Sequence, residues 1–489
     1  MCFHRISFIL LFSLIIFSAK GQINVNSDAA INTKHPDSLL TVPKNQLKAA
    51  GLILATNVSV WAYDRFIVGG NYARINLNTI KRNFKTGFTG DNDGFLTNLL
   101  SHPYHGIMYF NSARSNGMNF WQSVPFTASG SLMWEFFMEN ETPAINDFIS
   151  STVGGSCLGE MSYRISDQLI DERTVGFERF KREALLTIIS PIRGLNRILN
   201  GEAWNHRNSR GNTLPSIPIS FYSTIGYRMI IDNSQKYNNV IQMTCYDVNV
   251  NYGNPFDPDN EKPYDFFTIK ISGNLFSPQS IVGQVNGKGL IFSKNISFQK
   301  SGDQMTLGIF QYFNFFQVDN EINHVSITPF KISEAASFGP GLMFKSNLTG
   351  NLLFTGSAHL GAVLLGGYNN DYHENNIRNY NMGSGYSSKF NMALQYGNRL
   401  SLSLNLENYQ IYSWIGNLQS LTLTKGPIDY GDNGNAGVRV VALNLNYKIS
   451  QHLIVTAETG FFHGINNYKY YPVVNHSLTG NKLSIGYIF

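Results

Sequence analysis

The sequence predicts an α+β membrane protein, in which an N-terminal helical domain precedes an antiparallel transmembrane β-barrel of about 12 strands. Three observations lead to this fold class: the composition, an apolar–polar alternation in the second half of the chain, and helical patterns in the first half. Charged residues are 14% of the 489 residues, aromatic residues are 13%, and there are 44 glycines. Few charges with many aromatic residues and glycines are typical of outer-membrane barrels, which need aromatic girdles and many turns.

The N-terminus is typical of an export signal. The apolar run ISFILLFSLIIFS follows MCFHR and precedes the small residues of AKGQ. This run has the length of a signal-peptide core and is short for a spanning helix, so an uncleaved anchor is the weaker alternative. We expect a signal peptide over residues 1–21 and a polar linker over residues 22–47.

Residues 48–212 carry irregular helical patterns. Ser101 is a favoured helix cap, and Pro103 falls in the first turn that would follow it. Gly155 and Gly159 are four residues apart, a spacing that lets two helices approach closely. We expect a helical domain here, with helices near residues 47–66, 101–117, 120–140, 145–166 and 177–201.

Residues 213–489 alternate between apolar and polar side chains. In LSLSLNLE (400–407), leucines occupy every second position and polar residues occupy the others. The same period of two occurs in VALNLNYKI (441–449) and FTIKISGNL (267–275). Alternation over about ten residues is the pattern of a tilted transmembrane strand, with apolar side chains outward and polar ones inward. We therefore expect the barrel over residues 213–489.

The last strand supports a location in the cell outer membrane. The chain ends KLSIGYIF, with Leu483, Ile485 and Tyr487 on the same face as the terminal Phe489. This ending resembles that of outer-membrane barrels, which commonly finish on an aromatic residue with this spacing. We expect outer-membrane lipid as a partner. Nucleic acid is excluded, because the net charge is only +5 and no dense Lys/Arg stripe occurs.

Three long motifs in the helical region resemble a known family. HPYHGIMYFNSARSNGMNFW, WEFFMENETPAIND and TVGGSCLGEMSYR occur in this order. Together they are similar to the bacterial family filed as domain of unknown function 3943, over roughly residues 90–205. The resemblance implies an envelope protein of Gram-negative bacteria and implies no activity. One departure is Ala144, which stands where a serine is expected and removes a candidate hydroxyl.

Titratable residues gather in the helical region. Two histidines and several carboxylates could hold a divalent ion that activates water, or could transfer a proton. Their spacing matches no known metal motif, since HExxH is absent. We therefore expect no cofactor, with a divalent metal as a possible exception. The catalytic candidates are His102, His105, Glu135, Glu139 and Asp147.

A second reading of these charges is structural. Glu160 and Arg164 are four residues apart on a helix, in the order that favours an ion pair. Buried charged groups need partners, and packed helices supply them. The residues expected in such a polar network are Arg114, Asn146, Glu160 and Arg164.

Three functions remain open from the sequence. The favoured one is a non-enzymatic envelope component, in which the helical domain closes the lumen at the periplasmic mouth and docks other outer-membrane or periplasmic proteins. The second is an envelope hydrolase acting on lipid or glycan through the catalytic candidates. The third is a channel plugged by the helices.

Overall fold

A computed structural model describes residues 39–91, 93–233, 239–275, 281–298, 302–322, 325–372, 379–414 and 431–489. The predicted signal peptide and most of the predicted linker lie outside these residues. The chain forms two compact units. The helical unit comprises the described part of Met1–Asp91 together with Leu100–Pro218, and the barrel unit comprises the described part of Asn92–Leu99 together with Ile219–Phe489.

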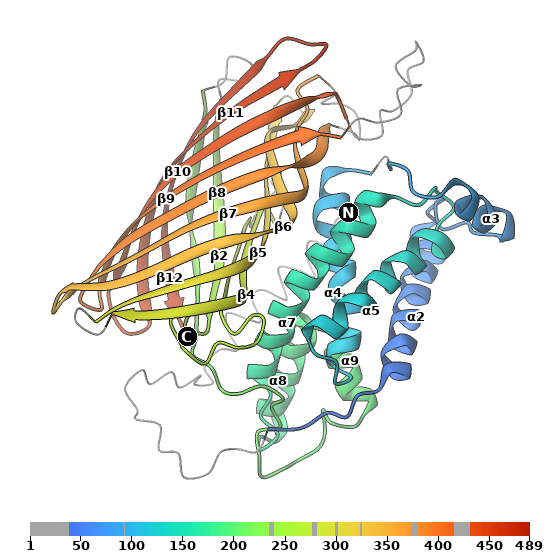
Figure 1. The fold of residues 1–489 in the computed structure, drawn as a ribbon, viewed down its shortest axis with the longest axis horizontal. Coiled ribbons are helices and arrows are strands. Elements are labelled where there is room, and N and C mark those ends of the chain that lie inside the picture. The colour runs from blue at the N-terminus through green and yellow to red at the C-terminus, as the bar shows by residue number, and fades with distance from the viewer. Residues whose placement is uncertain are drawn as a thin grey trace. The chain divides into compact units, whose positions relative to one another are not determined.

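The helical unit is a bundle of α-helices (Figure 1). It also contains short π-helical segments, which are named η1 to η4 here. None of the described helices combines the length and apolarity that crossing a membrane requires. The helical elements are α2 (Gln46–Tyr63), η1 (Asp64–Val68), α3 (Leu77–Thr86), η2 (Thr97–Ser101), α4 (His102–Arg114), α5 (Phe120–Met133), η3 (Trp134–Met138), α6 (Ile145–Ile149), η4 (Ser150–Gly154), α7 (Gly155–Leu169), α8 (Gly176–Ile189) and α9 (Pro191–Leu199). The first three residues of η2 belong to the barrel unit.

Local sequence explains where several helices begin. Asn119 caps α5, because its side chain accepts the Gln122 N–H while the Gln122 side chain accepts the Asn119 N–H. Pro191 starts α9 at a position where a missing N–H costs nothing. The expected cap at Ser101 is wrong: Ser101 ends the π-helical segment η2, which continues into α4, and its side chain caps no N–H. The helix therefore has no free N-terminus at Ser101 to cap.

Small residues let the central helices approach closely. A Cβ added to Gly155 of α7 would lie 2.5 Å from the Gly106 Cα of α4, and one added to Gly159 would lie 2.9 Å from the Phe110 Cβ. Side chains larger than hydrogen cannot occupy such positions without separating the helices. The contact between α4 and α7 therefore depends on glycine.

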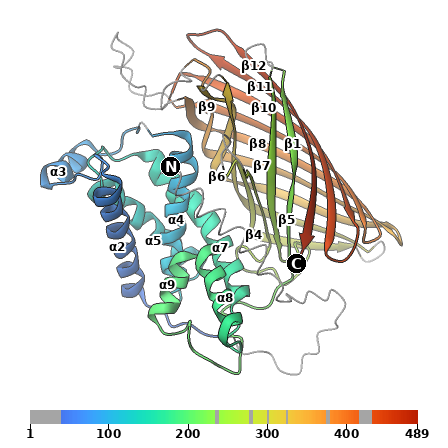
Figure 2. The same cartoon turned by 180° about the vertical axis from the view of Figure 1, so that it is seen from behind.

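Among the described residues, the barrel unit contains twelve antiparallel strands in a closed barrel (Figures 1 and 2). Each strand pairs with its neighbours in sequence, and β1 closes the barrel on β12 with Tyr222 opposite Ile488. The strands are β1 (Ile219–Asp232), β2 (Asn239–Tyr252), β3 (Phe267–Asn274), β4 (Gln284–Phe298), β5 (Asp303–Ile322), β6 (Val325–Thr349), β7 (Leu352–Asn369), β8 (Tyr380–Tyr396), β9 (Leu400–Ser413), β10 (Gly434–Lys448), β11 (Leu453–Tyr468) and β12 (Val474–Ile488).

The outer wall of the barrel is apolar. On β1 the exposed Ile225 and Tyr227 alternate with the buried or half-buried Thr224, Gly226 and Arg228. A large exposed apolar surface of this kind is stable only when lipid or a partner covers it. Further exposed apolar residues of the strands are Leu360, Phe390, Leu394, Leu402, Leu443, Leu445, Phe461, Leu483 and Ile485.

A short segment of the predicted helical domain belongs to the barrel unit. The Phe95 ring lies 5.2 Å from the ring of Phe315 on β5 and 5.3 Å from that of Tyr380 on β8. Asn98 Nδ2 donates a hydrogen bond to Tyr380 Oη at 2.7 Å. This segment, up to Leu99, is therefore anchored to the wall of the barrel.

Candidate functional site

Three candidate residues from separate elements meet in the helical unit. His102 begins α4, Glu135 lies in η3, and Asp147 lies in α6. One potential ligand atom from each lies within 4.8 Å of the other two, and His102 Nε2 is 3.5 Å from Asp147 Oδ1. Glu135 and Asp147 are buried, with 1% and 3% of their surfaces exposed. We call these three residues the His–Glu–Asp cluster.

The environment of Glu135 favours its protonated form when no cation is near. Burial raises the pKa of this carboxyl well above its usual value, and the charges of Glu139 and Asp147 raise it further. The Ala144 N–H donates a hydrogen bond to Glu135 Oε2 at 2.8 Å, which opposes the rise. A nearby cation would reverse this balance, because it stabilises the charged carboxylate.

His105 lies beside this cluster but makes different contacts. Its Nε2 is 2.9 Å from Tyr109 Oη, and Tyr109 Oη donates a hydrogen bond to Asn57 Oδ1. Burial, with a smaller effect of His102, lowers the pKa of His105 to about 3, so the ring is neutral near pH 7. Trp134 packs edge-on against this ring, with ring centroids 5.0 Å apart. His105 therefore belongs to a buried series of hydrogen bonds with Tyr109 and Asn57.

The relation of Glu139 to Glu135 differs from the expected one. The two residues are four positions apart, a spacing that would place them on one face of an α-helix, but η3 is π-helical and ends at Met138. Glu139 adopts an extended backbone, and its carbonyl accepts a hydrogen bond from Asn83 Nδ2 at 3.2 Å. The two carboxyl groups still interact, because Glu139 forms a side-chain hydrogen bond with Glu135.

Glu160 lies at the centre of a separate polar network. Arg114 donates two hydrogen bonds to it, at 2.7 and 2.9 Å, and Arg164 Nε donates one at 2.8 Å. Burial alone would raise the pKa of Glu160, but the two guanidinium groups hold it below its usual value. Asn146 lies elsewhere, where its Nδ2 donates to Asp147 and Asp91. Arg114, Glu160 and Arg164 thus link α4 to α7.

Sequence reasoning missed a second set of buried ion pairs. Asp167 pairs with Arg193 and accepts the backbone N–H groups of Thr213 and Leu214. Further along, Glu172 pairs with Arg197 at 3.0 Å and with Arg207 at 3.1 Å. The signal was present in α9, where Arg193 and Arg197 are four residues apart and share one helix face.

The barrel lumen is crossed by an apolar layer. The rings of Phe316 on β5 and Phe462 on β11 stack at 5.2 Å, and Phe330 on β6 contacts both. Strands β5 and β11 are separated by five strands in either direction around the barrel, so these rings can meet only across the lumen. The buried members of the same cluster are Ile230, Ile241, Met243, Val318, Phe330, Ile332, Tyr368, Tyr409, Ile411, Ala436, Val438 and Leu478. We call this cluster, with its flanking residues Phe316, Val440 and Phe462, the septum.

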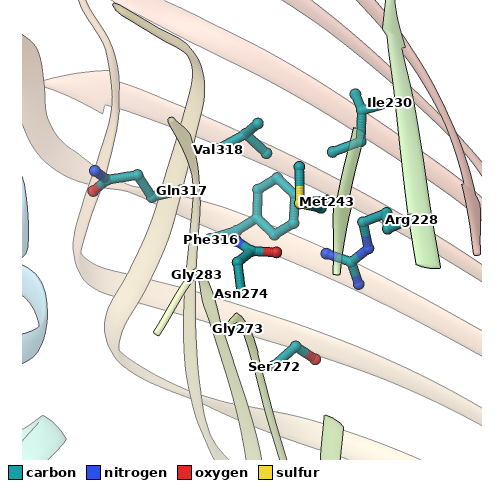
Figure 3. A pocket seen from close by; sticks show the side chains of 10 residues that line it. All are labelled: Arg228, Ile230, Met243, Ser272, Gly273, Asn274, Gly283, Phe316, Gln317 and Val318. Carbon is teal, nitrogen blue, oxygen red and sulfur yellow. The ribbon is translucent and has the colours of Figure 1, made fainter. Parts of the chain in front are cut away.

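Charged side chains also meet inside the barrel, along the arc of wall that runs from β11 through β12, β1 and β2 to β3. Lys482 on β12 pairs with Asp247 on β2 at 2.9 Å and with Glu458 on β11 at 3.0 Å, and Lys270 on β3 pairs with the same Glu458 at 3.4 Å. A cavity of about 10 Å³ lies where Arg228 borders the septum (Figure 3). That volume accommodates about one water molecule. Ion pairs therefore fill part of the lumen.

Comparison with known proteins gives a family match for one part of the chain. Residues 87–192 match the family described as "Domain of unknown function (DUF3943)", which confirms the resemblance predicted over residues 90–205. No curated protein matches the chain.

Solved structures similar to the chain include three porins or outer-membrane proteins. The NanC porin has 10% identity and a TM-score of 0.27, covering 54% of this chain and 98% of its own. The KdgM porin has 10% identity and a TM-score of 0.24, with 54% and 99% covered. OmpT of Vibrio cholerae has 11% identity and a TM-score of 0.22, with 55% and 97% covered. At these TM-scores nothing about this chain follows from the likeness.

The geometry of the barrel supports a location in the outer membrane. The twelve described strands close without an edge, so each strand has a hydrogen-bonded neighbour on both sides, as lipid requires. The exposed wall is also apolar, as a bilayer requires. The predicted fold class is confirmed, and the barrel lies in the cell outer membrane. The chain thus joins a helical region that matches the DUF3943 family over residues 87–192 to a closed outer-membrane barrel.

Proposed function

We propose that this protein is a non-enzymatic envelope component, whose barrel anchors it in the outer membrane without conducting and whose helical unit docks a partner protein. The septum is the observation that carries this proposal. Its side chains come from nine strands and meet across the lumen, with rings of opposite walls 5.2 Å apart. Tightly packed apolar side chains exclude ions, because an ion there would lose its hydration without compensation. The anchor role therefore fits the barrel better than the alternative of a channel plugged by helices.

The helical unit supports docking through the outward surface of α8 and α9. In α9, Arg193 and Arg197 are buried, whereas Leu199 on the opposite side is 63% exposed and the following Trp204 is 74% exposed. Large exposed apolar side chains of this kind mark interaction sites. We define the α8–α9 face by its exposed residues Val175, Phe177, Phe180, Ile198, Leu199 and Trp204.

A protein fits the α8–α9 face better than lipid does. Lys181 Nζ lies 5.6 Å from the centroid of the Phe177 ring and pairs with Glu178 at 2.6 Å. Ion pairs beside aromatic side chains resemble the polar rim of a protein interface, whereas acyl chains would leave these charges without water. That the helical unit also closes the periplasmic mouth stays a prediction.

Conductance in planar lipid bilayers tests the non-conducting barrel. We expect the purified full-length protein to show no steady channel current, and the triple variant Phe316→Ala, Phe330→Ala, Phe462→Ala to show a measurable one. The outer-wall variant Leu402→Ala, Leu445→Ala is the control and should stay silent. A steady porin-like current from the unmodified protein would overturn the proposal.

Photo-crosslinking in cells tests the docking. A photoreactive amino acid at Leu199 or Trp204 should give one discrete protein adduct, and the same group at Lys85 of α3 should not give that adduct. Adducts with lipid alone would contradict docking of a protein while leaving the conductance result untouched.

One observation favours a second candidate function, hydrolysis of an envelope lipid or glycan. The His–Glu–Asp cluster offers three ligand atoms within 4.8 Å. Catalytic metal sites use three protein ligands and leave a position for the attacking water. Loss of cellular function in Glu135→Gln, with the fold and the α8–α9 crosslink intact, would support this candidate over the non-enzymatic one.

A further inference from the structure

We propose that the His–Glu–Asp cluster of the helical unit is a binding site for one divalent transition-metal ion, best matched by Zn²⁺. The ligands are His102 Nε2 and one carboxylate oxygen each from Glu135 and Asp147. This inference is independent of the barrel's conductance and of the docking surface, because it concerns only residues inside the helical unit.

The spacing of the ligand atoms fits one ion. Two ligands about 2.1 Å from a tetrahedral zinc ion lie roughly 3.4 Å apart. His102 Nε2 and Asp147 Oδ1 are 3.5 Å apart, and all three ligand atoms lie within 4.8 Å of one another. A small closure of the Glu135 side chain would complete the set, since its atoms are already in the cluster.

Buried carboxylates of the helical unit make two kinds of polar contact. Glu160, Asp167 and Glu172 each form ion pairs with arginine side chains. Glu135 accepts a hydrogen bond from the Ala144 N–H and shares a side-chain hydrogen bond with Glu139, while Asp147 accepts from Asn146 Nδ2 and lies 3.5 Å from His102 Nε2. Two neighbouring buried carboxylates are costly without a compensating cation, and a bound divalent ion supplies that charge.

The backbone is π-helical at Glu135 and within three residues of His102 and Asp147. The π-helical segment η2 ends at Ser101, one residue before His102, and η3 contains Glu135. A third, η4, begins at Ser150, three residues after Asp147. π-Helical turns are rare and are frequent at functional sites, because they re-aim side chains at a cost in backbone hydrogen bonding. Three such turns converging on one cluster indicate that its side chains are positioned for a ligand.

Neighbouring groups provide the outer shell that metal ligands need. Asn146 Nδ2 donates a hydrogen bond to Asp147 Oδ1 at 2.7 Å, and the Ala144 N–H donates to Glu135 Oε2 at 2.8 Å. Such contacts fix ligand orientation in metal sites. One imidazole with two carboxylates suits Zn²⁺ better than Mg²⁺ or Ca²⁺, which prefer oxygen ligands alone.

Calorimetric titration with ZnCl₂ tests the site. The full-length protein in detergent, stripped with a chelator, should bind one Zn²⁺ per chain. His102→Ala, Glu135→Gln and Asp147→Asn should each weaken that affinity at least about 100-fold, since even outer-shell changes cost 10–100-fold. The matched controls His206→Ala and Glu178→Gln change exposed or half-exposed residues of the same types and should bind as the unmodified protein does.

A spectroscopic readout keeps the test decisive if a variant is less stable. Co²⁺ in place of Zn²⁺ should give visible absorption bands that change in His102→Gln, with circular dichroism confirming the fold. Absence of Zn²⁺ binding by the unmodified protein would overturn the inference. Binding that persists unchanged in all three ligand variants would overturn it equally, because it would place the ion at other side chains.

Discussion

The helical unit and the barrel unit place their polar groups differently. At the centre of the helical unit lie charged side chains such as Glu160 and Arg164, each fully or almost fully buried. Inside the barrel lies the apolar septum around Phe316 and Phe462, with ion pairs elsewhere in the lumen. Both units carry large apolar side chains on their outer surfaces, for example Leu199 and Leu445.

The two units therefore place different requirements on the residues inside them. A buried charge needs a specific partner at a specific distance, because an uncompensated charge in a protein interior is costly. An apolar layer needs only the right total volume, because dispersion and burial are not directional. The helical unit should therefore be sensitive to single substitutions that the septum would tolerate.

The largest expected effect comes from Glu160→Ala. It would leave the buried Arg114 and Arg164 without their shared carboxylate and should lower the free energy of unfolding of the helical unit by about 3–5 kcal/mol. Hydrogen exchange of the α4 and α7 amides in the full-length protein measures this change. Arg173→Ala, which breaks the pair between the exposed Arg173 and the half-buried Asp171, is the control and should change little. Equal amide protection from hydrogen exchange in Glu160→Ala and in the unmodified protein would show that the helical unit does not depend on this buried charge.

A smaller effect is expected from Gly155→Ala. The new Cβ would overlap the Gly106 Cα at 2.5 Å, and neither backbone can move without separating α4 from α7. We expect a loss of about 1–3 kcal/mol, measured by the same hydrogen exchange. Gly51→Ala in α2 is the matched control, because a Cβ there meets nothing within 4 Å. That variant should gain up to about 1 kcal/mol from helix propensity. Equal effects of the two substitutions would contradict close packing at Gly155.

Much of the fold could be predicted from the sequence, because strand and helix periods are local signals. The alternation in 400–407 and 441–449 predicted strands that the structure places in β9 and β10. The π-helical segments could not be predicted, since no residue pattern marks them, and this explains the wrong cap at Ser101 and the altered position of Glu139.

The candidate site was visible in sequence only as a set of residue types. His102, Glu135 and Asp147 lie far apart in the chain, and helix packing alone brings them together while leaving His105 in a separate hydrogen-bonded chain. The ion pairs of Asp167 and Glu172 were missed because their partners lie 25 or more residues away. Contacts of such sequence separation follow from tertiary structure, which local patterns do not encode.

The apolar side chains on the outer wall of the twelve described strands face lipid. Nitroxide labels at Leu402 of β9 and Leu445 of β10, in full-length protein reconstituted into bilayers, measure this most directly through collisions with oxygen and with a water-soluble nickel complex. We predict high oxygen access and low nickel access at both positions, because both side chains project from the outer wall and are exposed there. High nickel access at Leu402 and Leu445, equal to that of a label on a water-exposed loop, would show that these side chains face water and that the wall is not a lipid-facing surface.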